Sequence, residues 1–223
     1  MKALGLAFGV LMGLMVPALS QVPPTASQVQ SYSGLHAAAH TNDAAMIEAL
    51  VGGGADLNAR DDYGRTAAHV AAHASADDAL KALAKAGADM TLLENDRYDV
   101  ITIAAVADDP DLVKLAIELG GDPRAVTSRY DGTALIAAAH LGHAEVVQNL
   151  IDGGAPLDHV NNLGWTALIE AVILGDGGPR HQATVKALVD AGADKTIGDR
   201  DGITPLRQAI SRGSTEIARL LKD

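Results

Sequence analysis

Eight histidines are the residues of this chain best suited to chemistry, and several recur at a fixed spacing. His36 and His40 are four residues apart, and so are His69 and His73. Four-residue spacing places two imidazoles on the same face of a helix, an arrangement that can share a zinc ion. The pattern therefore gives metal or small-ligand binding as one hypothesis.

Catalysis would need a nucleophile with a base beside it, and the sequence offers no such set. The chain has no cysteine, which excludes thiol catalysis, thiolate metal ligands and disulfides. Serines and threonines fall at expected caps and loops, and the carboxylates recur where turns recur. We expect a protein that is not an enzyme and needs no cofactor.

Composition favours a packed, acidic protein that binds other proteins. Hydrophobic residues make up 48% of the 223 residues and aromatic residues only 3%, so the core must consist mainly of Ala, Leu, Val and Ile. The 28 acidic residues exceed the 17 basic ones, for a net charge of −11. This charge argues against nucleic acid and anionic membranes as ligands. A partner protein with a basic or apolar patch fits better.

The first twenty residues have the pattern of a cleavable secretory signal. Lys2 precedes an uncharged apolar run from Ala3 to Val16, and after Pro17 the segment Ala-Leu-Ser places small residues at the two positions that a signal peptidase reads. The run is shorter than the roughly 20 residues that span a bilayer. We expect residues 1–20 to be a signal peptide cleaved after Ser20, residues 21–32 to be a flexible lead-in, and the protein to be periplasmic or secreted, with no membrane insertion after cleavage.

A repeat of about 33 residues fills the rest of the chain. Similar segments such as GGADLN and AGADMT recur, and the glycines that head these loops are spaced 33, 33, 34 and 38 residues apart. They are Gly54, Gly87, Gly120, Gly154 and Gly192.

A second motif recurs in phase with these glycines. It begins at Thr66, Thr133, Thr166 and Thr204, as in Thr66-Ala67-Ala68-His69, and degenerate copies begin near Ser33 and Asp99. Apolar pairs in segments such as AEVVQNLID mark a helix that is buried on one side. Each unit is therefore expected to comprise a turn, a helix, a loop and a second helix.

These phased motifs resemble the ankyrin repeat, which has a similar period and a T-P-L-H-x-A motif. The resemblance implies an all-α ankyrin-repeat solenoid of about six stacked helix-loop-helix units joined by β-turn or hairpin loops, with a concave face. It covers residues 33–223, with units at 33–60, 61–93, 94–127, 128–160, 161–198 and 199–223.

Three units depart from the pattern, and in the fourth the departure is one extra residue between Gly120 and Thr133. The third lacks the motif threonine, glycine and histidine together, so we expect an irregular turn from Glu94 to Tyr98. The fifth carries a Gly-rich insertion from Gly175 to Gln182. No strand precedes the insertion and no Lys-Ser or Lys-Thr follows it, so we expect a surface loop and no phosphate site.

The repeat changes the interpretation of the histidines. His36 and His69 occupy the position of the histidine in the family motif. The resemblance implies that a histidine at this position is a structural residue that is hydrogen-bonded to loop backbone. That leaves His40, His73 and His140 at one equivalent position, as a column expected on the concave face. Such a column is suited to partner contacts that titrate near pH 6.5, and a metal site is the less favoured alternative.

The few aromatic residues indicate the binding surface. Trp165 and three of the four tyrosines fall at turn tips, and Trp, Tyr and Arg dominate interface energetics. In ankyrin-like proteins, partners usually contact the turn tips and the exposed side of each first helix. The expected partner-binding residues are Tyr63, Arg65, Tyr98, Arg129, Tyr130, Leu163, Trp165, His73, His140, Ile173 and Leu174.

The sequence thus predicts an exported, monomeric module that binds a partner protein through turn tips and the concave helix face. The alternative is a periplasmic protein that binds a metal or small ligand through the histidine column. A third interpretation of the tip aromatics is that their rings only cover neighbouring turns.

Overall fold

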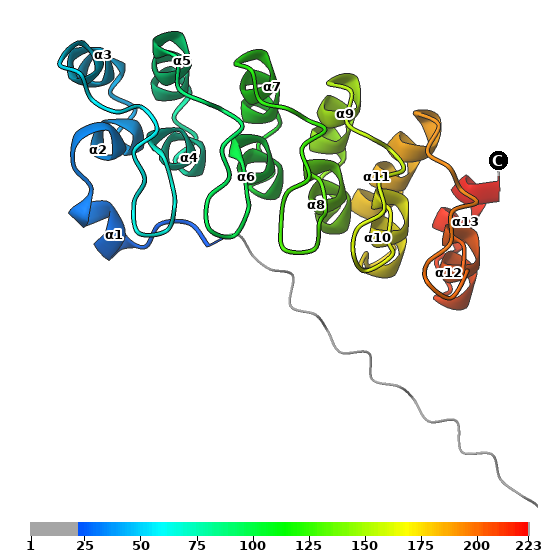
Figure 1. The fold of residues 1–223 in the computed structure, drawn as a ribbon. Helices are drawn as coiled ribbons and strands as arrows, with labels where there is room; N and C mark the ends of the chain where they lie inside the picture. Colours follow the sequence, from blue (N-terminus) through cyan, green and yellow to red (C-terminus); the bar gives the residue numbers. More distant parts are fainter. Residues whose placement is uncertain (1–21, 223) are drawn as a thin grey trace, which may run out of the picture.

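The computed structural model describes residues 22–222, and this part of the chain is an elongated stack of helices (Figure 1). The expected signal peptide at 1–20 lies outside the described residues. Within 22–222 there are thirteen helices and no strand, only an isolated bridge between Thr127 and Gly132. The prediction of an all-α solenoid is confirmed.

Six helix pairs follow a short helix α1, as the repeat predicts. The short helix α1 spans Ala26–Ser31. The pairs are α2 (Gly34–His40) with α3 (Ala44–Gly52), α4 (Ala67–His73) with α5 (Asp77–Ala86), α6 (Val100–Val106) with α7 (Pro110–Glu118), α8 (Ala134–Leu141) with α9 (Ala144–Asp152), α10 (Ala167–Ile173) with α11 (Pro179–Asp190), and α12 (Pro205–Ser211) with α13 (Thr215–Lys222).

The pairs form two layers (Figure 1). The first helix of each unit contacts the first helices of its neighbours, from α2 and α4 through to α10 and α12, and the second helices do the same. The connecting turns extend from the edge of the first-helix layer (Figure 1). The turn tips and the first helices of successive units therefore lie side by side along the stack.

Alanine makes the close stacking possible. In α4, Ala67, Ala68, Ala71 and Ala72 are all at most 1% exposed, and larger residues such as Leu80 fill the space toward the second helices. Small side chains let helix backbones approach closely, whereas rings would force them apart. This packing explains how a chain with only 3% aromatic residues forms one continuous core.

The turn tips of the second, third, fifth and sixth units share one hydrogen-bond pattern, whereas the fourth tip is one residue longer and pairs Thr127 with Gly132. In the second unit the Asp61 amide donates to the Arg65 carbonyl at 2.9 Å, and the Glu94 amide donates to the Tyr98 carbonyl at 3.0 Å in the third. Arg97 adopts φ +68° at the place that Gly64 holds with φ +75°. The expectation of an irregular turn at Glu94 to Tyr98 is therefore wrong, because Arg97 takes the left-handed conformation without a glycine.

Neighbouring tips are joined edge to edge by backbone hydrogen bonds. The Asn95 amide donates to the Tyr63 carbonyl at 3.0 Å, and the Asn162 amide donates to the Tyr130 carbonyl at 2.8 Å. Between them, the Ser128 amide donates to the Arg97 carbonyl at 3.0 Å. The tips are thus held in a row, which fixes the side chains that they carry.

The expected flexible lead-in is ordered from residue 22 onward. The Thr25 hydroxyl accepts from the Gln28 amide at 3.3 Å, and the Gln28 side chain accepts from the Thr25 amide at 2.8 Å, a capping box that begins α1. The Arg65 guanidinium then donates to the Val22 carbonyl at 2.8 Å. Residues 22–31, here called the N-terminal strap, therefore contact the second unit, and the prediction of flexibility is wrong for them.

The insertion in the fifth unit is more than a surface loop. It begins α11 at Pro179, and Arg180 Nη2 donates to Asp108 Oδ2 of the third unit at 2.7 Å. His181 Nε2 lies 3.1 Å from the carbonyl oxygen of His140 in the fourth unit. The insertion thus links three successive units.

Candidate functional site

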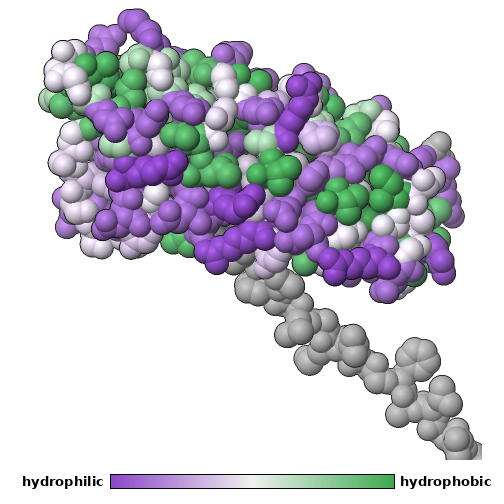
Figure 2. Space-filling model, viewed as in Figure 1, coloured by the Kyte–Doolittle hydropathy of each residue, from purple (hydrophilic) through white to green (hydrophobic). Residues whose placement is uncertain are grey.

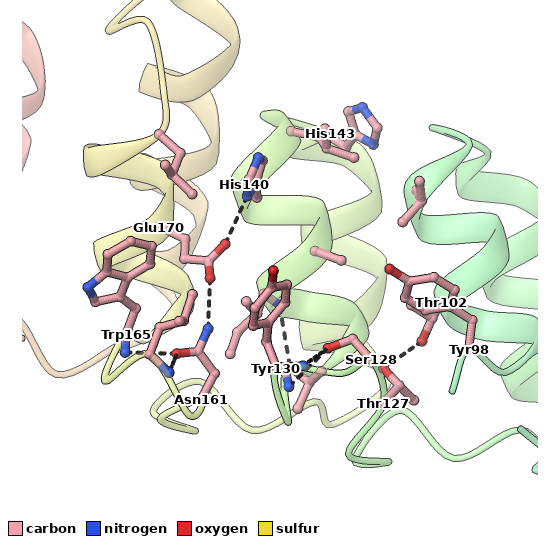
Figure 3. A pocket seen from close by; sticks show the side chains of 18 residues that line it. Tyr98, Thr102, Thr127, Ser128, Tyr130, His140, His143, Asn161, Trp165 and Glu170 are labelled. Carbon is pink, nitrogen blue, oxygen red and sulfur yellow. Dashed lines mark hydrogen bonds and ion pairs between the residues drawn. The ribbon is translucent and has the colours of Figure 1, made fainter. Parts of the chain in front are cut away.

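A pocket of about 260 Å³ forms a groove between the turn tips and the first helices of the third, fourth and fifth units (Figure 3). Its walls come from three turn tips and from helices α6, α8 and α10. Aromatic and aliphatic side chains predominate, and a few polar groups converge on it, a composition typical of binding sites. The lining includes Tyr98, Val106, Tyr130, Ile136, His140, Leu141, Asn161, Leu163, Trp165, Glu170 and Leu174.

Asn161 positions the tip that carries Trp165. Its Oδ1 accepts hydrogen bonds from the amides of Leu163 and Trp165, both at 3.0 Å. Gly164 allows the tight turn with φ +84°. The half-buried Trp165 ring therefore stands at one end of the pocket on a constrained backbone, with Tyr130 next along the groove (Figure 3).

A buried carboxylate forms part of the pocket floor. Glu170 on α10 is 5% exposed, and its Oε1 accepts from Asn161 Nδ2 at 2.8 Å. Its Oε2 lies 3.0 Å from His140 Nδ1 on α8 (Figure 3). Because a carboxylate can only accept, His140 Nδ1 carries the proton in this contact.

The opposite wall is built on the third unit, where the repeat motif is degenerate. Asp99 replaces the usual threonine and caps α6 by accepting from the Thr102 amide at 2.7 Å. Thr102, at the motif histidine position, donates to Thr127 Oγ1 at 3.0 Å. Burial raises the pKa of Asp99 and that of Tyr98, whose side chain faces the pocket from this wall (Figure 3).

Six of the expected partner-binding residues line this one pocket. They are Tyr98, Tyr130, His140, Leu163, Trp165 and Leu174. Tyr98 is only 7% exposed, so it forms a wall and not a protruding tip. Sequence analysis did not single out the floor residues Asn161 and Glu170, or His143, whose Nδ1 lies 2.9 Å from the Ala105 carbonyl oxygen.

The other expected residues lie elsewhere. Tyr63 is 46% exposed on the second tip, and Arg129 forms an exposed ion pair with Asp96. Ile173 is half-buried beside Leu174 and does not line the pocket.

Arg65 and His73 are corrected by the structure. Arg65 is 4% exposed, with its guanidinium 4.7 Å from the Tyr63 ring centroid and bonded to the N-terminal strap, so it is not an exposed tip residue. His73 lies beside Val22 of the strap. Burial and the nearby Arg65 charge lower the pKa of His73 to about 4, so it does not titrate near 6.5 as the column hypothesis expects.

The motif histidines bond to loop backbone, as the resemblance implies. His36 Nε2 lies 2.9 Å from the Arg65 carbonyl oxygen, and His69 Nε2 lies 2.9 Å from that of Leu92. Burial lowers the pKa of His69 to about 4. Across residues 22–222, no three His, Asp or Glu side chains come together as metal ligands would.

Comparison with known proteins agrees with the architecture. The family of ankyrin repeats matches residues 14–94 and 101–199 in its three-copy form and residues 179–221 in its many-copy form. A solved ankyrin repeat domain from Acinetobacter baumannii AYE is 41% identical, with a TM-score of 0.79, and the match covers 84% of this chain and 95% of that one. The ankyrin repeat protein EF0377 is 31% identical, with a TM-score of 0.78, over 86% of this chain and 99% of its own.

Curated relatives share only part of their length with this chain. YahD of Escherichia coli (strain K12), named as an ankyrin repeat protein, is 40% identical over 95 residues, which are 42% of this chain and 47% of YahD. Taken with the six helix pairs and the solved structures, the family match shows that the chain belongs to the ankyrin repeat family.

Proposed function

We propose that this protein is an exported, non-catalytic interaction module that holds a segment of a partner protein in the groove over its third to fifth units. The observation that carries the proposal is the pocket of about 260 Å³, whose walls bring Tyr98, Tyr130 and Trp165 together from three successive tips. Ankyrin repeats act as protein-interaction scaffolds, and aromatic residues in a pocket are typical interface anchors.

The groove is suited to binding because its walls are already fixed. The tip amides bond from unit to unit, and Asn161 holds the backbone of Trp165. A ligand would therefore order few side chains on binding, which reduces the entropic penalty of association. On the face drawn in Figure 2, hydrophobic residues form separate patches among mostly hydrophilic ones.

Export is proposed from the first twenty residues of the sequence, with cleavage after Ser20 and a periplasmic or secreted destination. Within residues 22–222 no helix is long and apolar enough to cross a membrane. The test is to express the full chain in its source cell and to measure the mass of the purified protein. The expected amino terminus is Gln21, and a purified chain that retains Met1 would contradict cleavage.

Partner binding is tested by affinity capture from the envelope fraction of the source cell. The bait is the protein expressed with its own leader, beside a Trp165→Ala variant and a Met46→Ala control. Met46 is 49% exposed on the first unit, away from the pocket. If Trp165 is an anchor, its replacement weakens binding by about 2 kcal/mol or more.

The expected result is a partner that is retained by the native and Met46→Ala proteins and lost by Trp165→Ala. A partner retained equally by all three would place binding away from the pocket. Circular dichroism melting of each variant confirms that the proteins compared are folded.

A further inference from the structure

The pocket lining contains one acidic side chain and no basic side chain other than histidine. Among the described residues that line it, Glu170 is the one carboxylate, and Lys, Arg and Asp are missing from the lining. The two titratable imidazoles are those of His140 and His143. A ligand that enters the pocket therefore meets an electrostatic field of negative sign.

Two side chains hold the Glu170 carboxylate in place. Asn161 Nδ2 and His140 Nδ1 both contact the carboxylate, at 2.8 and 3.0 Å. An amide brings no positive charge to the carboxylate, and an imidazole brings one only when it is protonated, whereas a buried carboxylate usually has a permanently charged partner. The site is thus complementary to an added cation.

Nearby arginines do not supply that cation. Arg97 is paired with Asp131 at 3.7 Å, and Arg129 is paired with Asp96. These pairs lie on the rim of the tips and largely neutralise one another. The negative charge at the pocket floor therefore remains for a ligand.

The pocket walls suit a long side chain with an apolar stem. Trp165, Tyr130 and Tyr98 present rings, and Leu163 and Leu174 add aliphatic surface. Aromatic faces attract cations, and the methylene stems of basic residues pack well on apolar surfaces. A cavity of about 260 Å³ is smaller than typical pockets for drug-sized ligands and suits one amino-acid side chain.

We propose that this pocket receives an arginine or lysine side chain from an extended segment of the partner protein. The stem lies against Trp165 and Leu163, and the cationic end lies toward the Glu170 carboxylate. The net charge of −11 favours the approach of such a basic segment. This inference rests on the proposed function and names the partner chemistry of the same groove.

The chain carries its own reporter for the test. Trp165 is the only tryptophan in the whole sequence, so its fluorescence reports on the pocket wall alone. The purified protein is titrated with the peptide N-acetyl-Leu-Arg-Leu-amide and with the same peptide containing citrulline. Citrulline keeps the planar shape of arginine but replaces the guanidinium by a neutral urea group.

We expect the arginine peptide to bind about tenfold more tightly than the citrulline peptide, as for a hydrogen bond to a charged partner. In a Glu170→Gln variant the advantage should fall to about twofold or less, because the field at the pocket floor is removed. A Glu145→Gln control makes the same charge change on the exposed surface of α9 and should keep the native ratio.

Equal affinity of the native protein for the two peptides would overturn the basic-residue proposal, even where a variant failed to fold. Capture that still depended on Trp165 would leave the proposed function intact in that case. N-acetyl-arginine amide that bound as tightly as the tripeptide would overturn the choice of a peptide and indicate a small free cation. Loss of the arginine preference in Glu145→Gln would show a general charge effect and also overturn the proposal.

Discussion

Asn161 and Glu170 are nine residues apart and form an amide–carboxylate pair across the fifth unit, with Nδ2 2.8 Å from Oε1. The sixth unit contains the same pair with the two groups exchanged. There, Gln208 Nε2 donates to Asp199 Oδ2 at 2.6 Å, while Asp199 Oδ1 accepts from the Ile203 amide at 2.9 Å. In these two units, the paired positions thus carry one amide and one carboxylate, in opposite order.

This exchange predicts the outcome of swapping the pair. Asn161→Asp alone should lower the free energy of unfolding by about 2 kcal/mol, because two carboxylates would then meet in a buried site. Combining it with Glu170→Gln should restore most of that loss, with a coupling energy of about 1–3 kcal/mol. Urea unfolding of the four proteins completes the cycle, and additive effects would contradict the proposed exchange.

His69 should make stability fall in acid. Its pKa is lowered from 6.5 to about 4, chiefly by burial, so the unfolded chain binds a proton between these values and the folded protein does not. Stability from this residue is complete above pH 6.5 and declines as the pH drops toward 4, by about 3 kcal/mol in all.

The test compares urea unfolding at pH 7 and pH 4 for the native protein and for His69→Gln. The variant is expected to be less stable at pH 7, because it lacks the contact to the Leu92 carbonyl. Its further loss at pH 4 should be about 3 kcal/mol smaller than that of the native protein. An identical loss in both proteins would mean that other groups account for the acid sensitivity.

Arg65 should hold the N-terminal strap against the second unit. Replacing it with Met keeps an apolar stem but removes the bond to the Val22 carbonyl and the partner of Asp61. We expect a loss of about 1–3 kcal/mol in stability and faster proteolysis within residues 22–31. Arg207→Met is the matched control, since Arg207 is exposed. A strap equally protected in both variants would argue against this role of Arg65.

Gly142 and Gly192 offer a comparison of strain with crowding. Both have positive φ, +72° and +92°. A Cβ on Gly142 would lie 3.1 Å from the His181 ring, whereas one on Gly192 would meet nothing within 4 Å. Alanine at Gly192 should cost about 1 kcal/mol from strain alone, and alanine at Gly142 about 1 kcal/mol more from crowding. If thermal melts showed the Gly142→Ala variant to be the more stable of the two, the His181 ring in the insertion would have moved aside at little energetic cost.

The fold could be predicted from the sequence because its signals recur. Gly54 and the equivalent glycines follow the second helix of successive units. A degenerate copy of the motif, such as the one near Asp99, can be recognised because the neighbouring copies are clear. Arg97 shows the limit of this approach. It adopts the left-handed backbone conformation that Gly64 adopts in the second unit. The sequence of the third unit has no glycine at this position, so it does not indicate that the turn is regular.

The site was predictable only where a residue type is rare. Trp165 and the tip tyrosines stand out because the chain has so few rings, and three of these four residues line the pocket. Glu170 does not stand out among 28 acidic residues, and its burial depends on contacts from Asn161 and His140 on other elements. Arg65 was misassigned because its partner Val22 is 43 residues away in a segment without repeat character.

The Arg180–Asp108 bridge joins residues 72 positions apart and passes over the fourth unit. In a plain ankyrin stack each unit touches only its neighbours, so the molecule stretches and bends like a uniform spring. Here the bridge connects the third and fifth units directly. Under a pulling force the first and last units should separate before the third, fourth and fifth, so the part of the stack that contains the pocket should keep its curvature longest.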